Sequence, residues 1–321
     1  MTAPRRPARD PELDSALSVL LPREPSLPTL SALADARRAT LAATSTAQEL
    51  SNKWGLTVED VQYSAEASAI ASIFGRSGAQ GRARPVFLYL HGGGLVMGNR
   101  FTGVEAALGW VEAFDAVVVS VEYRLAPEHR FPAAVEDAWA ALQWLRGVGA
   151  DLNADPSRIF VAGTSAGGGL AAHVAIRARD LGVPLAGQIL YCPMLDARND
   201  SSSAHQFAEL GPWSALDNET AWTATLGPDR RRPDRVRDAS PLLADDLGGL
   251  APAFLDVGSA EVFRDEVVEY ARRIWAAGGE AELHVWPGGF HGFTRKVPRA
   301  AISRNSARVR LDWIERRLSY G

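Results

Sequence analysis

The chain has 321 residues, of which 46% are hydrophobic and 22% are charged, and its formal net charge is −4. This composition is typical of a globular protein with a sizeable core, and the slight acidity gives no reason to expect nucleic acid or an anionic membrane as a partner. The single cysteine, Cys192, excludes an internal disulfide and any metal cluster built from cysteines. Because no window approaches about 18 uncharged apolar residues and the start has no apolar leader, we expect a soluble, cytoplasmic protein without stable membrane insertion.

The first 56 residues have the pattern of a helical preface. Residues 1–11 are rich in Pro and Arg, and apolar residues then recur at helical spacing over 13–21 and 30–50. Three prolines between these stretches separate the two predicted helices. Nothing in this part alternates as a strand would. We expect residues 1–56 to form the N-terminal part of a cap.

Strands and helices alternate through most of the remaining chain. An antiparallel pair is expected over 58–67 and 68–74. Apolar runs of strand type follow at 85–90, 116–123, 158–162, 186–191, 253–257 and 281–286, with helical segments at 104–114, 133–145, 169–181, 264–277 and 301–318. This alternation favours an α/β fold, with a mostly parallel central sheet covered by helices on both faces.

One stretch interrupts the alternation. The segment at about 196–240 is rich in Ser, Asp, Trp and Pro, and it is too long for a plain connection. We therefore predict a catalytic body formed by residues 57–195 and 241–321, and a cap insertion formed by residues 196–240.

The run from Ile159 to Leu170 combines a strand, a sharp turn and a helix around Ser165. The turn is Gly163-Thr164-Ser165-Ala166-Gly167, which matches the G-x-S-x-G nucleophile elbow in its expected context. The helix that follows points its amino end at the serine, which favours developing negative charge there. A phosphate-binding loop would need a lysine in this turn, and none is present.

A second glycine cluster, His91-Gly92-Gly93-Gly94, directly follows the predicted strand at 85–90. Glycines leave backbone N–H groups uncovered, and two such donors at the end of a strand can hold an oxyanion. This run accompanies G-x-S-x-G in lipases and esterases. We predict that the oxyanion hole is formed by Gly93, Gly94 and Ala166, with Gly92 as a further candidate.

A serine hydroxyl needs a general base, because it is not ionised near neutral pH. His291 lies among glycines in a loop between the last predicted strand and the last helix, where it could reach across the end of the sheet. We therefore predict that His291 is the base. The other histidines lie in the glycine loop, in other loops, on a helix or inside a strand: His91, His129, His173, His205 and His284.

The base in turn needs a carboxylate that orients it. Asp256 lies inside the strand at 253–257, Asp265 begins a helix, and Glu261 lies on the loop between them, where a triad acid should sit. Asp196, beyond the preceding strand, is a more distant alternative. The order of serine, acid and histidine is that of α/β-hydrolases.

These motifs together resemble the hormone-sensitive-lipase-like branch of bacterial esterases. The resemblance extends from about residue 86 to the C-terminal helix. It depends on five runs: 91–94 (HGGG), 123–129 (YRLAPEH), 131–134 (FPAA), 163–168 (GTSAGG) and 291–293 (HGF).

The resemblance implies an α/β-hydrolase fold with a helical cap, Ser165 as the nucleophile and His291 as the base. It places the acid at Glu261, where the family more often has Asp, and the elbow has Thr164 where Asp is commoner. It also points to a homodimer formed at the edge of the last strand. The oligomeric state stays open from the sequence.

The expected function is a serine carboxylic-ester hydrolase that forms an acyl-enzyme on small-molecule esters of short-to-medium acyl groups. Its chemistry requires no metal and no organic cofactor. The alternatives are a non-catalytic small-molecule-binding protein on the same scaffold, and an amide or lactone hydrolase with the same triad. Five cap residues could line an acyl or alcohol pocket or simply hold the cap to the body: Phe207, Leu210, Trp213, Leu216 and Trp222.

Overall fold

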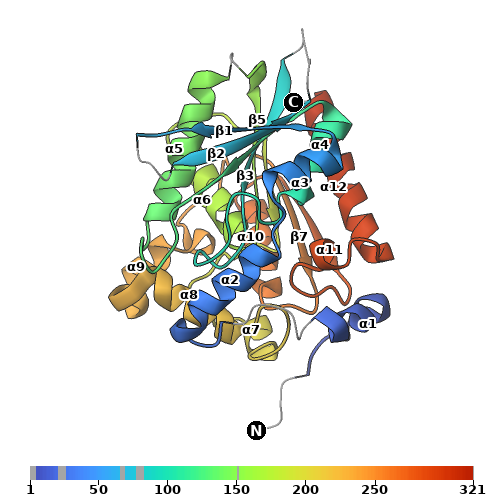
Figure 1. Ribbon diagram of the computed structural model, residues 1–321. Helices are drawn as coiled ribbons and strands as arrows, with labels where there is room; N and C mark the ends of the chain where they lie inside the picture. Colours follow the sequence, from blue (N-terminus) through green and yellow to red (C-terminus); the bar gives the residue numbers. More distant parts are fainter. Residues whose placement is uncertain (1–4, 21–26, 66–68, 77–82, 150–151, 321) are drawn as a thin grey trace.

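The computed structural model describes residues 5–20, 27–65, 69–76, 83–149 and 152–320, and it is built around one eight-stranded sheet (Figure 1). The strands are β1 (Thr57–Gln62), β2 (Ile70–Gly75), β3 (Arg84–Leu90), β4 (Val117–Val121), β5 (Ala154–Thr164), β6 (Gly187–Tyr191), β7 (Ala253–Gly258) and β8 (Ala281–Trp286). Their spatial order is β1-β2-β4-β3-β5-β6-β7-β8.

The longer helices are α1 (Pro11–Leu20), α2 (Leu33–Ala42), α3 (Ala47–Trp54), α4 (Glu105–Phe114), α5 (Ala133–Val148), α6 (Ala166–Asp180), α8 (Ala215–Leu226), α10 (Arg264–Ala276) and α12 (Ala301–Tyr320). The shorter helical turns are η2 (Leu30–Ala32), α7 (Ser202–Gln206), η3 (Gly227–Arg231), α9 (Pro233–Asp238), η4 (Pro241–Leu243) and α11 (Phe293–Lys296).

The mostly parallel sheet predicted from the sequence is confirmed. Only β2 runs against its neighbours, because it pairs antiparallel with both β1 and β4, and the pairs from β4 to β8 are parallel. Every residue of β4 and of β6 is buried, as expected for strands covered on both faces. Helices α4 and α12 contact each other on one face, and α5, α6 and α10 cover the other (Figure 1).

The strand register brings four loops to one edge of the sheet. Leu90 of β3 pairs with Gly163 of β5, so the glycine cluster after β3 lies beside the turn after β5. Gly258 of β7 pairs with Trp286 of β8, so the loops that carry Glu261 and His291 also start side by side. Because carboxyl ends of parallel strands meet at one edge, the predicted site residues converge there.

The prediction of one continuous helix over 30–50 is wrong. The structure has two helices here. The first, α2, ends at Ala42, and α3 begins at Ala47, directly after Thr46. The Thr46 side chain accepts a hydrogen bond from the backbone N–H of Glu49, and the Glu49 carboxylate accepts one from the backbone N–H of Thr46 at 2.8 Å. This capping box begins a new helix, and helical periodicity alone did not reveal the break.

The N-terminal helices lie in two separate places. The segment before α2 contacts α8, because the backbone N–H of Leu27 donates to Asp217 at 2.6 Å. In contrast, α1 packs its Leu13 and Leu17 against Phe290 and Phe293, which flank His291. Among the described residues, no helix combines the length and the apolar character needed to cross a bilayer.

Candidate active site

Ser165 lies in a strained turn between β5 and α6. Its backbone has a φ of 58° and a ψ of −120°, a conformation that residues other than glycine rarely adopt. Its N–H donates to the carbonyl of Tyr191 at 2.8 Å. A Cβ on Gly163 would lie 2.1 Å from the carbonyl oxygen of Gly167, and one on Gly167 would lie 2.0 Å from that of Leu90. The two motif glycines therefore allow the close packing that holds the serine in place.

The three predicted triad residues meet in one hydrogen-bonded chain. His291 Nε2 lies 3.1 Å from Ser165 Oγ, and His291 Nδ1 lies 2.6 Å from Glu261 Oε2. All three side chains are buried. The imidazole also packs edge-on against Phe263, with ring centroids 5.2 Å apart. With Nδ1–H donating to the carboxylate, Nε2 is left to accept a proton from the serine.

The Glu261 carboxyl lies in a dehydrated environment beside the imidazole. Burial raises the pKa of Glu261 above its ordinary value, and the neighbouring His291 opposes that rise. Its second oxygen, Oε1, has no hydrogen-bond partner among the described residues. A proton taken up by His291 would give it a positive charge, and the attraction between that charge and the carboxylate would stabilise both groups.

The other candidate acids are held elsewhere. Asp256 accepts hydrogen bonds from Arg310 at 2.6 Å and from Ser306 at 2.7 Å, so it belongs to a buried ion pair with α12. Asp265 accepts a hydrogen bond from the backbone N–H of Ser203 at 2.8 Å. Asp196 pairs with its neighbour Arg198. Glu261 alone of the four is bonded to His291.

Among the described residues, the backbone N–H groups of Gly93, Gly94 and Ala166 have no protein acceptor, and Gly93 and Gly94 line the same cavity as Ser165. His91 Nδ1 lies 2.8 Å from the carbonyl of Gly92, to which it can donate, and its ring stacks on Tyr123 with centroids 4.0 Å apart. Since the C=O and N–H of one peptide point in opposite directions, fixing the Gly92 carbonyl also fixes the Gly93 N–H.

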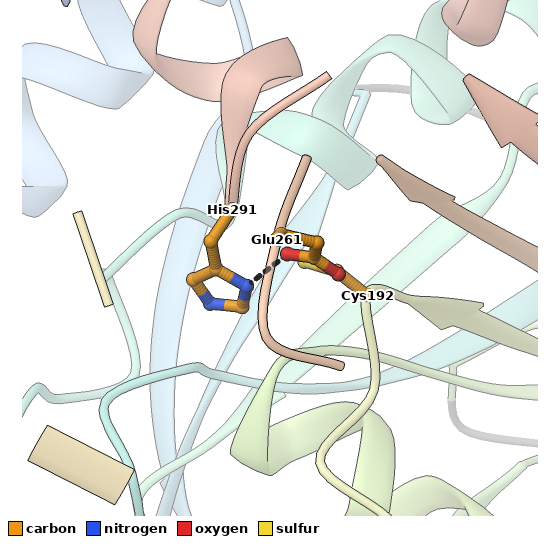
Figure 2. A group of neighbouring side chains, drawn as sticks. All are labelled: Cys192, Glu261 and His291. Carbon is orange, nitrogen blue, oxygen red and sulfur yellow. Dashed lines mark hydrogen bonds and ion pairs between the residues drawn. The ribbon is translucent and has the colours of Figure 1, made fainter. Parts of the chain in front are cut away.

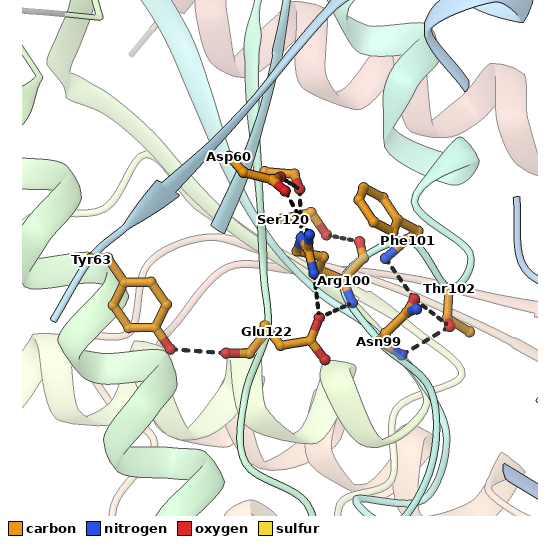
Figure 3. A network of polar contacts seen from close by, with 9 residues as sticks. Asp60, Tyr63, Asn99, Arg100, Phe101, Thr102, Ser120 and Glu122 are labelled. Atoms are coloured by element: carbon orange, nitrogen blue, oxygen red, sulfur yellow. Dashed lines mark hydrogen bonds and ion pairs between the residues drawn. The ribbon is translucent and has the colours of Figure 1, made fainter. Parts of the chain in front are cut away.

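A polar network fastens the loop that follows the glycine cluster (Figure 3). Arg100 donates to Asp60 of β1 at 2.7 Å and to Glu122, after β4, at 3.0 Å. Its backbone carbonyl accepts a hydrogen bond from Ser120 at 2.5 Å. These contacts join strands β1 and β4 to the loop, so the glycine cluster is held from both of its ends.

A second arginine fixes α2 against the same loop. Arg37 donates to the carbonyl of Val96 at 2.7 Å and to that of Ala126 at 2.8 Å, and it forms a two-pronged ion pair with Glu128. This pair lowers the pKa of Glu128 to about 2. Helix α2 is thereby placed beside the serine.

A cavity of about 170 Å³ opens beside Ser165 and His291. Trp213 is the only one of the five predicted pocket residues among the side chains that line it, and its ring lies over Gly94. The structure does not place the other four there. Phe207 and Trp222 are buried members of the main hydrophobic core, whereas Leu210 and Leu216 are exposed to solvent.

Sequence reasoning missed the opposite wall of the cavity. It is formed by Thr40, Ala43 and Thr44 at the end of α2, by Tyr89 and Thr102, and by Arg295 and Lys296 of α11. No local motif marks these residues, because the wall forms only when α2 folds back over the sheet. The one available signal was the spacing of Thr40 and Thr44, which puts both on one face of the helix predicted over 30–50.

Cys192 lies behind the acid–base pair, and its sulfur, a Glu261 oxygen and a His291 nitrogen all lie within 4.8 Å of one another (Figure 2). Such a group could in principle hold a metal ion. However, burial raises the pKa of the Cys192 thiol well above its ordinary value, and metals bind the thiolate. The hydrogen bond already joins Glu261 to His291, so the group fits an acid–base pair better than a metal centre.

Comparison with known proteins places this geometry in a family. The family model described as the α/β-hydrolase fold matches residues 87–295. Esterase LipI of Mycobacterium tuberculosis is 38% identical over 233 residues, which cover 71% of this chain and 72% of that protein. The solved structure of a bacterial heroin esterase superposes with a TM-score of 0.86 at 34% identity, covering 97% of this chain and 98% of the other.

A receptor is also among the relatives. The gibberellin receptor GID1 of Oryza sativa subsp. japonica is 33% identical over 196 residues, which cover 58% of this chain and 54% of that protein. The scaffold thus includes both enzymes and a binding protein. The chain belongs to the α/β-hydrolase family, in its branch of hormone-sensitive-lipase-like bacterial esterases.

Proposed function

We propose that this protein is a serine carboxylic-ester hydrolase, with Ser165 as nucleophile, His291 as general base and Glu261 as the orienting acid. The observation that carries the proposal is the continuous chain from Ser165 Oγ through His291 to Glu261, with contacts of 3.1 and 2.6 Å. The named esterases among the relatives support the reaction class.

The reaction follows from this arrangement. His291 Nε2 takes the proton of Ser165 Oγ as that oxygen attacks the ester carbonyl. The tetrahedral oxyanion is stabilised by the N–H groups of Gly93, Gly94 and Ala166, and by the amino end of α6. His291 then gives its proton to the leaving alcohol, and a water molecule activated by His291 hydrolyses the acyl-enzyme.

The size of the cavity bears on the substrate. A cavity of about 170 Å³, closed on one side by Trp213, favours esters with short-to-medium acyl groups. We therefore expect activity to fall for long acyl chains. A panel of amides and lactones of matched size would separate ester hydrolysis from the two related reactions.

The test is an acyl-chain series of p-nitrophenyl esters, from acetate to dodecanoate, with the wild type, Ser165→Ala and Glu261→Gln. We expect highest kcat/KM for the shorter chains in the wild type, and stoichiometric labelling of Ser165 by a fluorophosphonate. Absence of turnover on the whole series, with one small molecule bound tightly, would favour a receptor-like role instead. The intact hydrogen-bonded triad speaks for catalysis.

Three further points belong to this proposal. The cap is formed by residues 196–240 together with the described parts of residues 1–56, of which Leu27 contacts Asp217 and α1 packs against Phe290 and Phe293. The protein forms a homodimer through β8, which pairs with β7 on one side only. It works in the cytoplasm, where its single cysteine stays reduced. Limited proteolysis, light scattering and cell fractionation test these points in turn.

A further inference from the structure

The catalytic cavity has an uneven charge. Among the described residues that line it, Arg295 and Lys296 carry cationic side chains, and none is an Asp or a Glu. The rest of the described lining is formed by glycines, threonines, a few apolar side chains, and Tyr89, Ser165 and His291. A positive potential at the mouth of a low-dielectric cavity attracts an anionic group on a ligand.

The backbone of Arg295 is held in place by the short helical turn that follows His291. It lies four residues after His291, in the short turn α11, where its backbone N–H donates to the carbonyl of Gly292 at 3.1 Å. Its Cδ lies 3.4 Å from the point where a Cβ on Gly103 would stand. Tyr89 Oη lies 3.4 Å from the same point, so the Arg295 side chain passes close to Tyr89 among the residues that line the cavity.

The charge of Arg295 reaches into the cavity. Burial raises the pKa of the Tyr89 hydroxyl to about 12, and Arg295 acts against that rise. The same hydroxyl donates to the carbonyl of Gly103 at 2.8 Å and lies 3.1 Å from the side-chain hydroxyl of Thr164, the residue before Ser165. The positive charge of Arg295, which acts on Tyr89, therefore also acts close to Ser165.

Arg295 has no carboxylate partner in the part of the chain that the structure describes. This sets it apart from Arg100, Arg124 and Arg310, which all form ion pairs. Glu105 acts on Tyr89 from the other side, but it lies outside the cavity and accepts a hydrogen bond from Ser45. Within the described ranges its guanidinium has no hydrogen-bond partner, so its five N–H donors can serve a ligand.

We propose that Arg295 makes this site prefer esters that carry a second, ionised acid group, such as half-esters of dicarboxylic acids, over neutral esters of the same size. The guanidinium binds a carboxylate through two parallel hydrogen bonds, which fixes the ester as well as attracting it. The preference rests on the proposed ester hydrolysis. It specifies the substrate class of the same site.

The experiment compares two pairs of substrates, each matched in shape. Monomethyl adipate and methyl hexanoate differ by a carboxylate in place of a methyl group at the end of the acyl chain. O-acetyl-γ-hydroxybutyrate and butyl acetate differ in the same way on the alcohol side. The rate of acid release near neutral pH gives kcat/KM for each, and the ratio of charged to neutral substrate is the readout.

We expect this ratio to fall about fivefold in Arg295→Gln for at least one pair, because an exposed ion pair contributes modestly. Arg295→Lys keeps the positive charge but not the two parallel hydrogen bonds, so it should keep only part of the ratio. Added salt should lower the ratio in the wild type but not in Arg295→Gln. Arg299→Gln is the matched control. It removes an exposed arginine outside the cavity and should leave both the ratio and the basal activity unchanged.

An unchanged ratio in Arg295→Gln for both pairs would overturn the preference, whereas hydrolysis of the neutral esters that depends on Ser165 would leave the proposed function standing. If the wild type hydrolyses none of the esters, this would instead contradict the proposed function itself. The two failures are therefore distinguishable.

Discussion

Nδ1 of His291 lies 2.6 Å from Oε2 of Glu261, although Glu261 has one methylene more than the aspartate that is commoner at this position in the family. The longer side chain still reaches the imidazole, because Glu261 lies on the loop directly after β7, beside the strand that leads to His291. The hydrogen bond directs Nε2 at Ser165. The first prediction therefore concerns a variant in which Glu261 loses its charge.

Glu261→Gln keeps the shape of the side chain but not its charge, and its amide can bind the wrong tautomer of His291. We expect kcat to fall by about 10⁴, as for the equivalent change in serine proteases, with little change in KM. Glu261→Asp keeps the charge and should lose much less. Steady-state kinetics on p-nitrophenyl butyrate measure both, and equal losses in the two variants would argue that charge is not what matters.

Arg37 is the second target, because it ties α2 to the loop that carries Gly93 and Gly94. Arg37→Met removes hydrogen bonds to two backbone carbonyls, and we expect the free energy of unfolding to fall by about 2 kcal/mol and kcat to fall as the loop loosens. Arg38→Met is the matched control, since Arg38 is an exposed neighbour that pairs with Asp35. Urea unfolding should separate the two, and similar losses would contradict this role.

The third prediction concerns the elbow. In Gly167→Ala the new Cβ would lie 2.0 Å from the backbone carbonyl of Leu90, which cannot move without shifting β3. We expect loss of activity and a destabilisation of several kcal/mol. In Gly147→Ala the added methyl meets nothing within 4 Å, and better helix propensity should stabilise the protein by up to about 1 kcal/mol. Thermal unfolding of the pair checks the sign of each change.

The fourth prediction is a loss of stability in mild acid. His173 is neutral, because burial lowers its pKa from 6.5 to about 4, and its Nε2 lies 3.2 Å from the carbonyl of Ala239. Between these values the unfolded chain binds a proton that the folded chain does not. Stability should thus be full above pH 6.5 and fall towards pH 4, by up to about 1.4 kcal/mol for each pH unit.

His173→Gln keeps a hydrogen-bond donor without this titration. The variant should lose less stability than the wild type between pH 6.5 and 4, as measured by urea unfolding at several pH values. His91 is also buried, and its pKa is lowered by that burial, so part of the dependence should survive in the variant. Identical pH profiles for the two proteins would rule His173 out as a cause.

The fold could be predicted because its strands are continuous apolar runs separated by helical spacing, as β4 with its buried valines illustrates. Ser165 and His291 were singled out by the glycines that surround them, since the tight turns and close approaches that a site needs leave a local trace. Glu261 was harder to select among nearby acids, and it is the contacts of Asp256 and Asp265 that set those two apart.

The wall of the cavity left no such trace. Thr40 and Thr44 are brought to Ser165 by a helix far away in sequence, which is held there by Arg37 through contacts with two loops. Leu210 and Leu216 show a second limit, because the sequence suggests that they either line a pocket or hold the cap to the body, and both are exposed to solvent. Periodicity predicts that a residue lies on one face of a helix, but not which surface that face meets.

The measurement that tests the account most directly is the kcat/KM of Ser165→Ala on p-nitrophenyl butyrate, beside the wild type. Removing the hydroxyl removes the nucleophile, so we predict a loss of several orders of magnitude, with the fold unchanged by circular dichroism. Activity within tenfold of the wild type would show that Ser165 does not carry the reaction and would contradict the mechanism.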